Sequence, residues 1–264
     1  MKILFIGDIC GEPGRRAVAV LLPGLREKFG PDLVIANAEN VAGGKGITED
    51  TGKALFKSGI DLLTSGNHHW DKKGIEDYMA KEPRLIRPAN YPSVERFPCP
   101  GKGFIVVTAK DGTKVGVLNL QGRVFMPPID CPFRTADEIL SELRNDTNVI
   151  VVDMHAEATS EKRAMGFYLD GRVSGVIGTH THVQTADEQI MPHGTAYITD
   201  VGMTGPINSG IGVEFKQVLQ RFITMRPIKY DIAKEEGRMN GVVIEIDPKS
   251  GKASSIQRID LLAG

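Results

Sequence analysis

The chain opens on Lys2-Ile3-Leu4-Phe5-Ile6-Gly7-Asp8, in which an unbroken apolar run from Ile3 to Ile6 leads to a glycine and an acid. Such a run indicates a strand buried on both faces, as in parallel sheets. Similar runs follow at 32–37 and 61–64, and residues 14–28 and 48–58 between them read as helices. This order of β, α, β, α and β elements predicts a parallel sheet with helical crossovers.

Single residues suggest where these two helices bend, begin and end. Pro23 is expected to kink or split the first helix, because proline lacks a backbone donor and clashes with the preceding turn. Thr48 can cap the start of the second helix, and Gly59 is expected to end it.

The rest of the chain mixes a hairpin with further helices and strands. Asp111-Gly112 joins two β-prone stretches at 103–109 and 113–119, which is a strong hairpin signal. Helices are expected at 135–143, 160–169 and about 214–224, and strands at 149–153, 173–177, 190–191, 197–199, 228–232, 242–246 and 255–261. We therefore predict an α/β fold in which two mixed β-sheets pack together and are flanked by helices, as one domain over residues 1–264.

Two segments have no predicted element: the proline-rich stretch 87–101 and the glycine-rich stretch 201–213. Both are longer than simple connections, and loops of this length often form the walls or lids of sites. A surface excursion without a role is the alternative reading.

Composition narrows the setting of the protein. With 264 residues, of which 41% are hydrophobic, the chain can bury a full core. Its net charge of −1 gives no strong signal for nucleic acid or an anionic membrane. No apolar run approaches the roughly 20 residues needed to cross a bilayer. Cys10, Cys99 and Cys131 have no disulfide or zinc spacing, so we expect reduced thiols in the cytoplasm.

Polar side chains follow the predicted strands at the point where each strand ends. Asp8 follows the first strand, and the pair Glu39-Asn40 follows the second. Five of the six histidines lie in three motifs after later strands: Gly66-Asn67-His68-His69-Trp70-Asp71, Asp153-Met154-His155-Ala156-Glu157 and Gly178-Thr179-His180-Thr181-His182. Imidazole, carboxylate and amide oxygen are ligands of borderline divalent metals, so the pattern predicts a metalloenzyme.

The histidines differ in their expected roles. If the segment is extended, His180 and His182 face one site while Thr181 faces away. His68 would then lie near the metals without binding them, where an imidazole can act as a proton donor. We expect His69 to pack or to form hydrogen bonds, and we leave His193 out of the site.

Taken in order, these motifs resemble those of the calcineurin-like metallophosphoesterases. The sequences Gly-Asp-Ile, Ala-Glu-Asn, Gly-Asn-His, Asp-x-His-Ala-Glu and Gly-Thr-His-Thr-His-Val-Gln-Thr-Ala-Asp are similar to its YmdB-like branch of bacterial phosphodiesterases. The resemblance runs from Lys2 to Met203. One departure from the wider superfamily is Cys10, which stands where the usual Asp-x-His motif has its histidine.

The resemblance implies the calcineurin-like fold and a dinuclear metal centre. One metal would be held by Asp8, Glu39, Asn40 and His182, and the other by Asn67, His155 and His180 together with Glu39 as the bridge. Two divalent ions about 3.5–4 Å apart lower the pKa of a shared water and clamp phosphoryl oxygens. The implied ions are iron, with manganese as the alternative. The implied reaction is attack of a metal-bridged hydroxide on phosphorus, with His68 as the proton donor.

The implied substrates are small phosphodiesters, in particular 2′,3′- and 3′,5′-cyclic nucleotides. Tyr91, Phe125 and Phe133 could stack on a base but are interpreted as packing residues. Two alternatives stay open. A dinuclear amidohydrolase also uses His-x-His, although there the pair follows the first strand of a barrel. The other alternative is a non-enzymatic, metal-dependent binding or regulatory protein. Assembly into a homo-oligomer also stays open.

Overall fold

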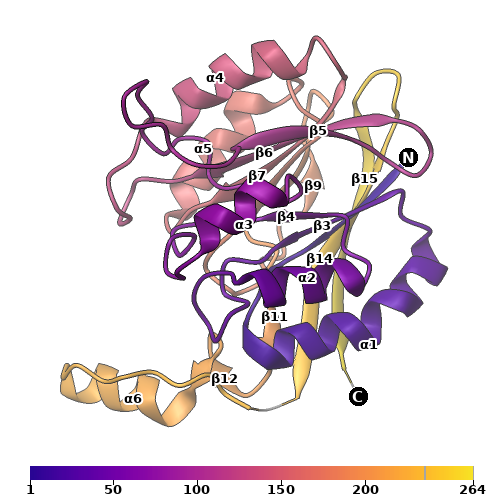
Figure 1. The fold of residues 1–264 in the computed structure, drawn as a ribbon. Coiled ribbons are helices and arrows are strands. Elements are labelled where there is room, and N and C mark those ends of the chain that lie inside the picture. Colours follow the sequence, from indigo (N-terminus) through magenta and orange to yellow (C-terminus); the bar gives the residue numbers. More distant parts are fainter. Residues whose placement is uncertain (235, 264) are drawn as a thin grey trace.

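The computed structural model describes residues 1–234 and 236–263, so the expected domain 1–264 includes two residues, Glu235 and Gly264, that lie outside the described part. Two β-sheets pack face to face, and helices cover the outer face of each sheet (Figure 1). The predicted α/β fold of two packed mixed sheets is confirmed. These open sheets are not the barrel that the amidohydrolase alternative requires.

The first sheet carries the start and the end of the chain. Its strand order is β2-β11-β14-β1-β3-β4, and β15 pairs with β14. The parallel neighbours β1, β3 and β4 form the predicted crossover unit, while β14 runs antiparallel to β1. The strands are β1 Lys2–Ile6, β2 Asp8–Ile9, β3 Leu33–Asn37, β4 Leu62–Thr64, β11 Met203–Pro206, β14 Gly237–Ile246 and β15 Ala253–Leu262.

The second sheet is built from the middle of the chain. Its order is β5-β6-β7-β8-β10-β9, in which β6, β7, β8 and β10 are parallel and the edge strands are antiparallel. The strands β5 and β6 form the predicted hairpin around Asp111-Gly112. The strands are β5 Phe104–Thr108, β6 Lys114–Gln121, β7 Val149–His155, β8 Gly175–Thr179, β9 Gln189–Ile190 and β10 Ala196–Ile198.

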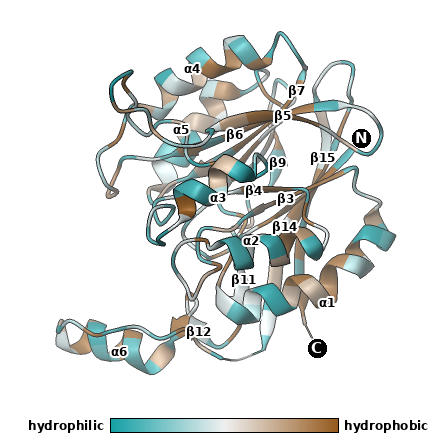
Figure 2. Cartoon of the chain, viewed as in Figure 1, coloured by the Kyte–Doolittle hydropathy of each residue, from teal (hydrophilic) through white to brown (hydrophobic). Residues whose placement is uncertain are grey.

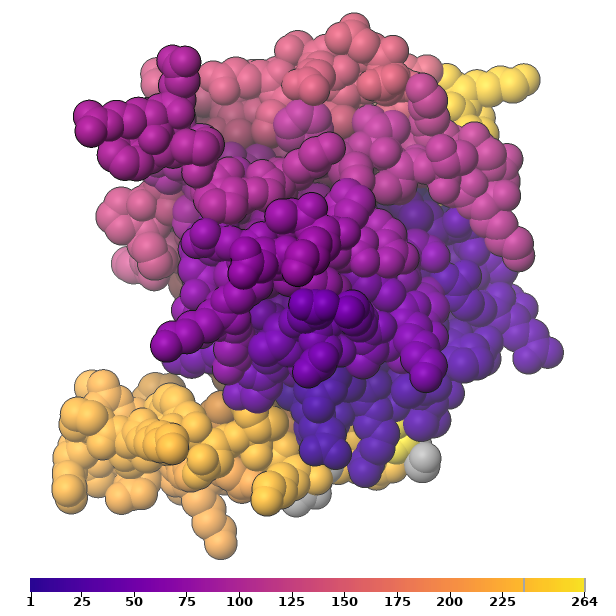
Figure 3. Space-filling view, in the orientation of Figure 1, coloured from indigo at the N-terminus to yellow at the C-terminus, as the bar shows by residue number. Residues whose placement is uncertain are grey.

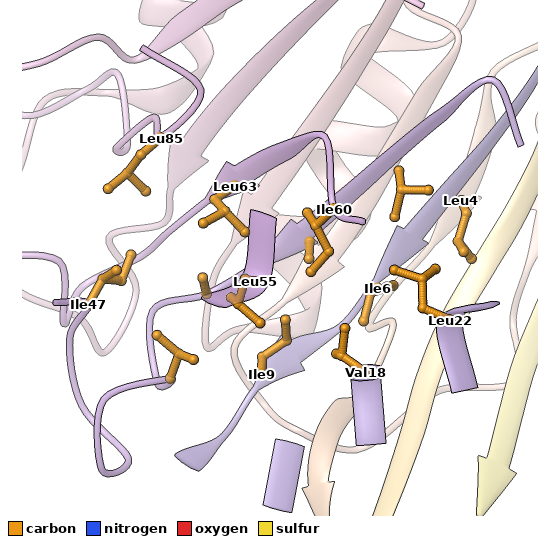
Figure 4. Close-up of a cluster of buried hydrophobic side chains, with 14 of the residues drawn as sticks. Leu4, Ile6, Ile9, Val18, Leu22, Ile47, Leu55, Ile60, Leu63 and Leu85 are labelled. Carbon is orange, nitrogen blue, oxygen red and sulfur yellow. The ribbon is translucent and has the colours of Figure 1, made fainter. Parts of the chain in front are cut away.

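The opening strand β1 is buried on both faces, as its apolar run predicts. Leu4 and Ile6 pack under the helices of the first sheet, in the cluster shown in Figure 4. Ile3 and Phe5 point to the other face and pack between the two sheets. Successive side chains of a strand alternate between faces, so a strand in the middle of four layers must be apolar throughout.

The helices α1 to α5 each bury one face against a sheet. Coloured by hydropathy, the strands form a largely apolar centre and the helices carry polar residues outward (Figure 2). The helices α1, α2 and α3 belong to the cluster on the first sheet, and α4 and α5 to that on the second. The helices are α1 Gly11–Phe29, α2 Glu49–Lys57, α3 Ile75–Lys81, α4 Pro132–Leu143, α5 Thr159–Leu169 and α6 Phe215–Thr224.

Helix boundaries agree with the sequence in part. Thr48 caps α2 in a reciprocal pair with Thr51, as predicted. The prediction that Pro23 splits the first helix is wrong, because α1 is a single helix with Pro23 inside it. It also begins at Gly11, three residues before the predicted start. Helix α4 likewise begins earlier than predicted, with Pro132 in its first turn, where proline is tolerated.

Two local predictions fail, and one helix has no predicted counterpart. The predicted strand 228–232 is not a strand: within the described residues it forms only an isolated bridge between Ile232 and Val213 of β13. The stretch 201–213 is not only a loop, since it contains β11, whose Gly205 and Pro206 read as breakers. Helix α3 was not predicted.

The segment from β12 to α6 projects from the body of the protein as an arm (Figures 1 and 3). It comprises β12 Ser209–Gly210, β13 Val213–Glu214 and α6. No residue of α6 is buried, and Phe222 and Ile223 are each 73% exposed. Within the described part of the chain, no helix combines the length and the apolar character needed to traverse a bilayer.

Candidate metal centre

The predicted ligands come together at the carboxyl ends of strands from both sheets. Ends of parallel strands meet at one edge of a sheet, so side chains that follow them converge. Asp8 begins β2 directly after β1, Glu39 and Asn40 follow β3, Asn67 follows β4, His155 ends β7, and His180 and His182 follow β8. Asp8, Glu39, Asn40 and His155 are buried, and the other three are half-buried.

Imidazole nitrogens and carboxylate oxygens form two sets that share the carboxylate of Glu39. Ligand atoms of Glu39, His155 and His180 lie within 4.8 Å of one another, and so do those of Asp8, Glu39 and His182. His68 belongs to neither of these sets in the described residues. Glu39 therefore lies where a bridging ligand between two ions would lie.

Two amide oxygens complete the sets. The Oδ1 atom of Asn67 is 3.1 Å from Nε2 of His155, and Oδ1 of Asn40 is 3.2 Å from Nε2 of His182. Each set thus gains a neutral oxygen of the kind that borderline divalent metals accept.

Hydrogen bonds behind His155 fix which ring nitrogen faces the site. The hydroxyl of Thr179 donates to Asp153 over 2.7 Å, so its oxygen accepts a proton from Nδ1 of His155, 2.9 Å away. Asp153 is itself buried and also accepts from Asn37 and Thr64. In the neutral ring the lone pair is therefore on Nε2, which points into the site.

The other two histidines are oriented in the same way. Nε2 of His180 is 3.0 Å from a carboxylate oxygen of Glu157, and Nδ1 of His182 is 2.9 Å from the carbonyl of Ile211. Both outer nitrogens donate to these acceptors. Nδ1 of His180 and Nε2 of His182 are consequently left to face the site as lone pairs.

Acceptor atoms crowd together in the centre without donors between them. Nε2 of His155 lies 3.1 Å from Nδ1 of His180 and 3.2 Å from a carboxylate oxygen of Glu39. Ligands held at about 2.0–2.2 Å from one ion, at angles of about 90–110°, lie about 2.8–3.6 Å apart. Oδ1 of Asp8 is buried and has no hydrogen-bond partner among the described residues. The donor set therefore fits divalent cations.

The pKa values of the buried groups also indicate that the site suits divalent cations. Burial lowers the pKa of His155, but the charges of Glu39 and Asp8 outweigh burial and raise it to about 9. Burial would raise the pKa of Glu39, yet His155 lowers it to about 2. Burial raises the pKa of Asp8 to about 7. Without a cation, a proton on His155 compensates the buried carboxylates, and a bound metal would replace it.

The ligand segments are not extended as the alternation argument assumed. His180 and His182 have φ values of 98° and 64°, in the left-handed region, so they reach the site from a tight turn. Asn67 and His68 lie in another turn, closed by bonds from the amide of His69 to Gly66 and from that of Asp71 to His68. His180 and His182 do reach the site, and so do Asn67 and His68, but each pair lies in a turn and not in an extended segment.

Close approach of the chain requires a glycine beside this second turn. A Cβ atom at Gly66 would lie 2.2 Å from Nε2 of His155 and 2.4 Å from Oε2 of Glu39. Only glycine leaves room for both ligands at this point.

Residues that were left out of the site lie elsewhere. His69 is buried and bonded to Ser65, and burial lowers its pKa to about 3. His193 is exposed on a loop. Cys10 is buried before α1, and burial raises the pKa of its thiol to about 12, which does not favour a thiolate ligand.

Of the aromatic candidates, two pack as expected and one does not. Tyr91 contacts Trp70 edge to face, and Phe133 contacts Tyr168 in the same way. Phe125 is 90% exposed, so the prediction that it packs is wrong. The stretch 201–213 contributes a wall of the site, because the carbonyl of Ile211 orients His182.

Comparison with known proteins identifies the family. A sequence model of the YmdB-like protein matches residues 4–259. The chain belongs to the YmdB-like family. A relative from Bacillus subtilis (strain 168), named 2′,3′-cyclic-nucleotide 2′-phosphodiesterase, is 51% identical over 98% of this chain and 96% of its own length. The predicted membership of the family and of the phosphodiesterase class of enzymes is confirmed.

Two solved structures resemble the whole chain. A hypothetical protein from Thermus thermophilus is 42% identical, with a TM-score of 0.92 over 99% of both chains. A structure described as a novel phosphatase from Mycoplasma pneumoniae is 35% identical, with a TM-score of 0.93 over 99% of this chain and 93% of that chain. The metallophosphoesterase type of fold is thereby confirmed.

Sequence reasoning did not identify the residues that orient the ligands. Asp153 lies two residues before His155 on the same strand, a spacing that puts both side chains on one face. Asp200, which contacts Thr181, follows a separate strand, and no sequence spacing links the two residues.

Proposed function

We propose that this chain is a phosphodiesterase that holds two divalent cations and hydrolyses 2′,3′- and 3′,5′-cyclic nucleotides. The observation that carries the proposal is the convergence of acceptor atoms into two sets that share Glu39. The ligands of one cation would be Asp8, Glu39, Asn40 and His182, and those of the other would be Glu39, Asn67, His155 and His180. This mixture of imidazole and oxygen ligands suits iron, with manganese as the alternative.

The charges of the site suit a phosphodiester substrate. Two divalent cations would supply a water of lowered pKa and positive charge toward the phosphoryl oxygens. The proposed ligand set includes only two carboxylates, Asp8 and Glu39, which balance half of that charge. An excess of positive charge remains to attract a phosphodiester anion, although the whole chain has a net charge of −1.

The position of His68 suits a proton donor. Its backbone amide donates to Oε2 of Glu39 over 3.1 Å, so the residue is anchored to the proposed bridging ligand. Its Nδ1 lies 2.9 Å from a carboxylate oxygen of Asp71, and its side chain is 26% exposed. Asp71 thus accepts a hydrogen bond from Nδ1 and orients the ring, while Nε2 stays available to protonate a leaving ribose oxygen.

The proposed substrate class is tested with a panel of esters on protein reconstituted with iron(II) or manganese(II). We expect hydrolysis of 2′,3′-cyclic AMP, 3′,5′-cyclic AMP and bis(p-nitrophenyl) phosphate. Separation of products by chromatography shows which bond breaks, and a 3′-monophosphate from the 2′,3′ ester would match the name of the Bacillus subtilis relative. If the protein binds two ions but cleaves none of these esters, it is the binding or regulatory protein of the alternative hypothesis.

Replacement of the shared carboxylate tests the assignment of the bridge. Glu39→Gln should lower both metal content and turnover, because an amide cannot bridge two cations as a carboxylate does. Metal content is measured by elemental analysis of the purified variant. His193→Ala is the matched control: its side chain is exposed, so two ions and normal turnover are expected. Wild-type metal content in Glu39→Gln would remove Glu39 from the centre.

We also infer a cytoplasmic location. Cys10, Cys99 and Cys131 are all free thiols, as the cysteine spacing predicts. Free thiols suit a reducing compartment.

A further inference from the structure

A buried ion pair lies behind the ligand turn of residues 180–182. Nζ of Lys162, on α5, is 2.6 Å from Oδ2 of Asp200, which follows β10. The side chains are 0% and 1% exposed. Lysine is almost never buried so completely, and burial of both charges is expensive even when they pair. The pair therefore calls for a role beyond stability.

Asp200 connects this pair to the proposed ligands. Its Oδ2 accepts bonds from the backbone amide and the hydroxyl of Thr181, at 3.0 and 2.7 Å. Thr181 is the residue between His180 and His182. The other oxygen, Oδ1, accepts from the amide of Gly202 at 2.8 Å, and the carbonyl of Gly202 accepts from the amide of Asp8. One carboxylate thus contacts the turn of residues 180–182 directly and the segment of Asp8 through Gly202.

The ligand turn needs such support. His180 and His182 both have left-handed φ values, which residues other than glycine adopt only when their surroundings hold them there. Their ring nitrogens face different sets of ligands. A small rotation of Thr181 would therefore move both imidazoles away from their sets.

We propose that Lys162 and Asp200 are positioning residues of the metal centre. Asp200 holds Thr181, and through it His180 and His182, in the geometry that binds two cations. Lys162 orients Asp200 through the ion pair. The inference rests on the proposed role of these histidines as ligands.

The direction in which metal affinity changes when Lys162 is replaced distinguishes a positioning role from a purely electrostatic one. A buried ammonium group repels nearby cations, so Coulomb's law alone predicts tighter metal binding when Lys162 is replaced by a neutral residue. Positioning predicts weaker binding instead. A purely structural ion pair would lower the melting temperature of the metal-free protein and leave metal affinity unchanged.

The test compares Lys162→Met, Thr181→Val and the control Thr195→Val. Thr181→Val removes one hydroxyl bond to Asp200 and keeps the ion pair, so it tests the proposal even if Lys162→Met does not fold. Thr195 is a buried threonine directly before β10, and its hydroxyl donates to the carbonyl of Val173 over 2.7 Å. It lies at the opposite end of the second sheet from the metal centre.

Manganese(II) affinity is measured by competition with a fluorescent chelator, and stability by melting of the metal-free proteins. We expect Lys162→Met and Thr181→Val each to weaken binding about 10- to 100-fold, the usual effect of losing a partner that orients a ligand. Thr195→Val should lower the melting temperature and leave affinity within about twofold. In an Asp200→Asn background, Lys162→Met should change affinity less than about threefold, because Lys162 acts through Asp200.

Two results would overturn the inference: wild-type affinity in both Lys162→Met and Thr181→Val, or tighter binding in Lys162→Met. A different result would overturn the proposed function itself, namely a wild-type protein that binds fewer than two ions. The two failures are therefore distinguishable in one experiment.

Discussion

His68→Ala should keep two metal ions per chain and lose about 10²–10⁴-fold in turnover of a cyclic nucleotide, the usual contribution of a positioned general acid. The metals should stay because the side chain of His68 is in neither ligand set, and the bond to Glu39 comes from its backbone amide, which alanine retains. Metal analysis and steady-state kinetics on the same sample measure both quantities.

A second substrate shows whether the lost function is proton donation. The leaving group of an aryl phosphodiester is acidic enough to depart without a proton, whereas a ribose alkoxide is not. The loss in His68→Ala should therefore be much smaller for bis(p-nitrophenyl) phosphate. Equal losses for both substrates would show that His68 binds the phosphate instead, and loss of the metals would make it a ligand.

The sequence was most informative about strands buried on both faces. The runs at 3–6 and 33–36 are apolar throughout, and both lie in central strands of the first sheet because each packs against a helix layer and a second sheet. The strand β11 was missed because Gly205 and Pro206 are poor strand formers, and pairing with its neighbours overrides this preference. The arm was not predictable, since the apolar face of α6 resembles that of a packed helix.

For the site, residue types at strand ends were enough to select the candidate ligands, but they did not predict the backbone conformation of the ligand segments. His180-Thr181-His182 has the spacing of two strand residues on one face, and the chain there instead forms a left-handed turn. What holds that turn is a contact between Thr181 and Asp200 across 19 residues, together with Lys162 from α5. Such contacts depend on packing, which local sequence patterns do not contain.

Removal of the metals should have the largest effect of all, a loss of turnover of at least about 10³-fold, because the cations supply both the activated water and the charge that neutralises the phosphodiester. The carboxylate and imidazole groups that surround Glu39 are the proposed ligands of these cations. Without cations, His155 would hold a proton, because buried carboxylates raise its pKa to about 9. The fold should survive, since three clusters of buried apolar side chains hold the sheets and helices together.

The dependence of turnover on bound metal is measured most directly by titration of metal-free protein with manganese(II), or with iron(II) under exclusion of oxygen. Hydrolysis of 2′,3′-cyclic AMP is followed at each addition, and the number of bound ions is determined in parallel. A dinuclear centre predicts negligible turnover without metal and a maximum at two ions per chain. Full turnover in the metal-free protein, or a maximum at one ion per chain, would contradict it.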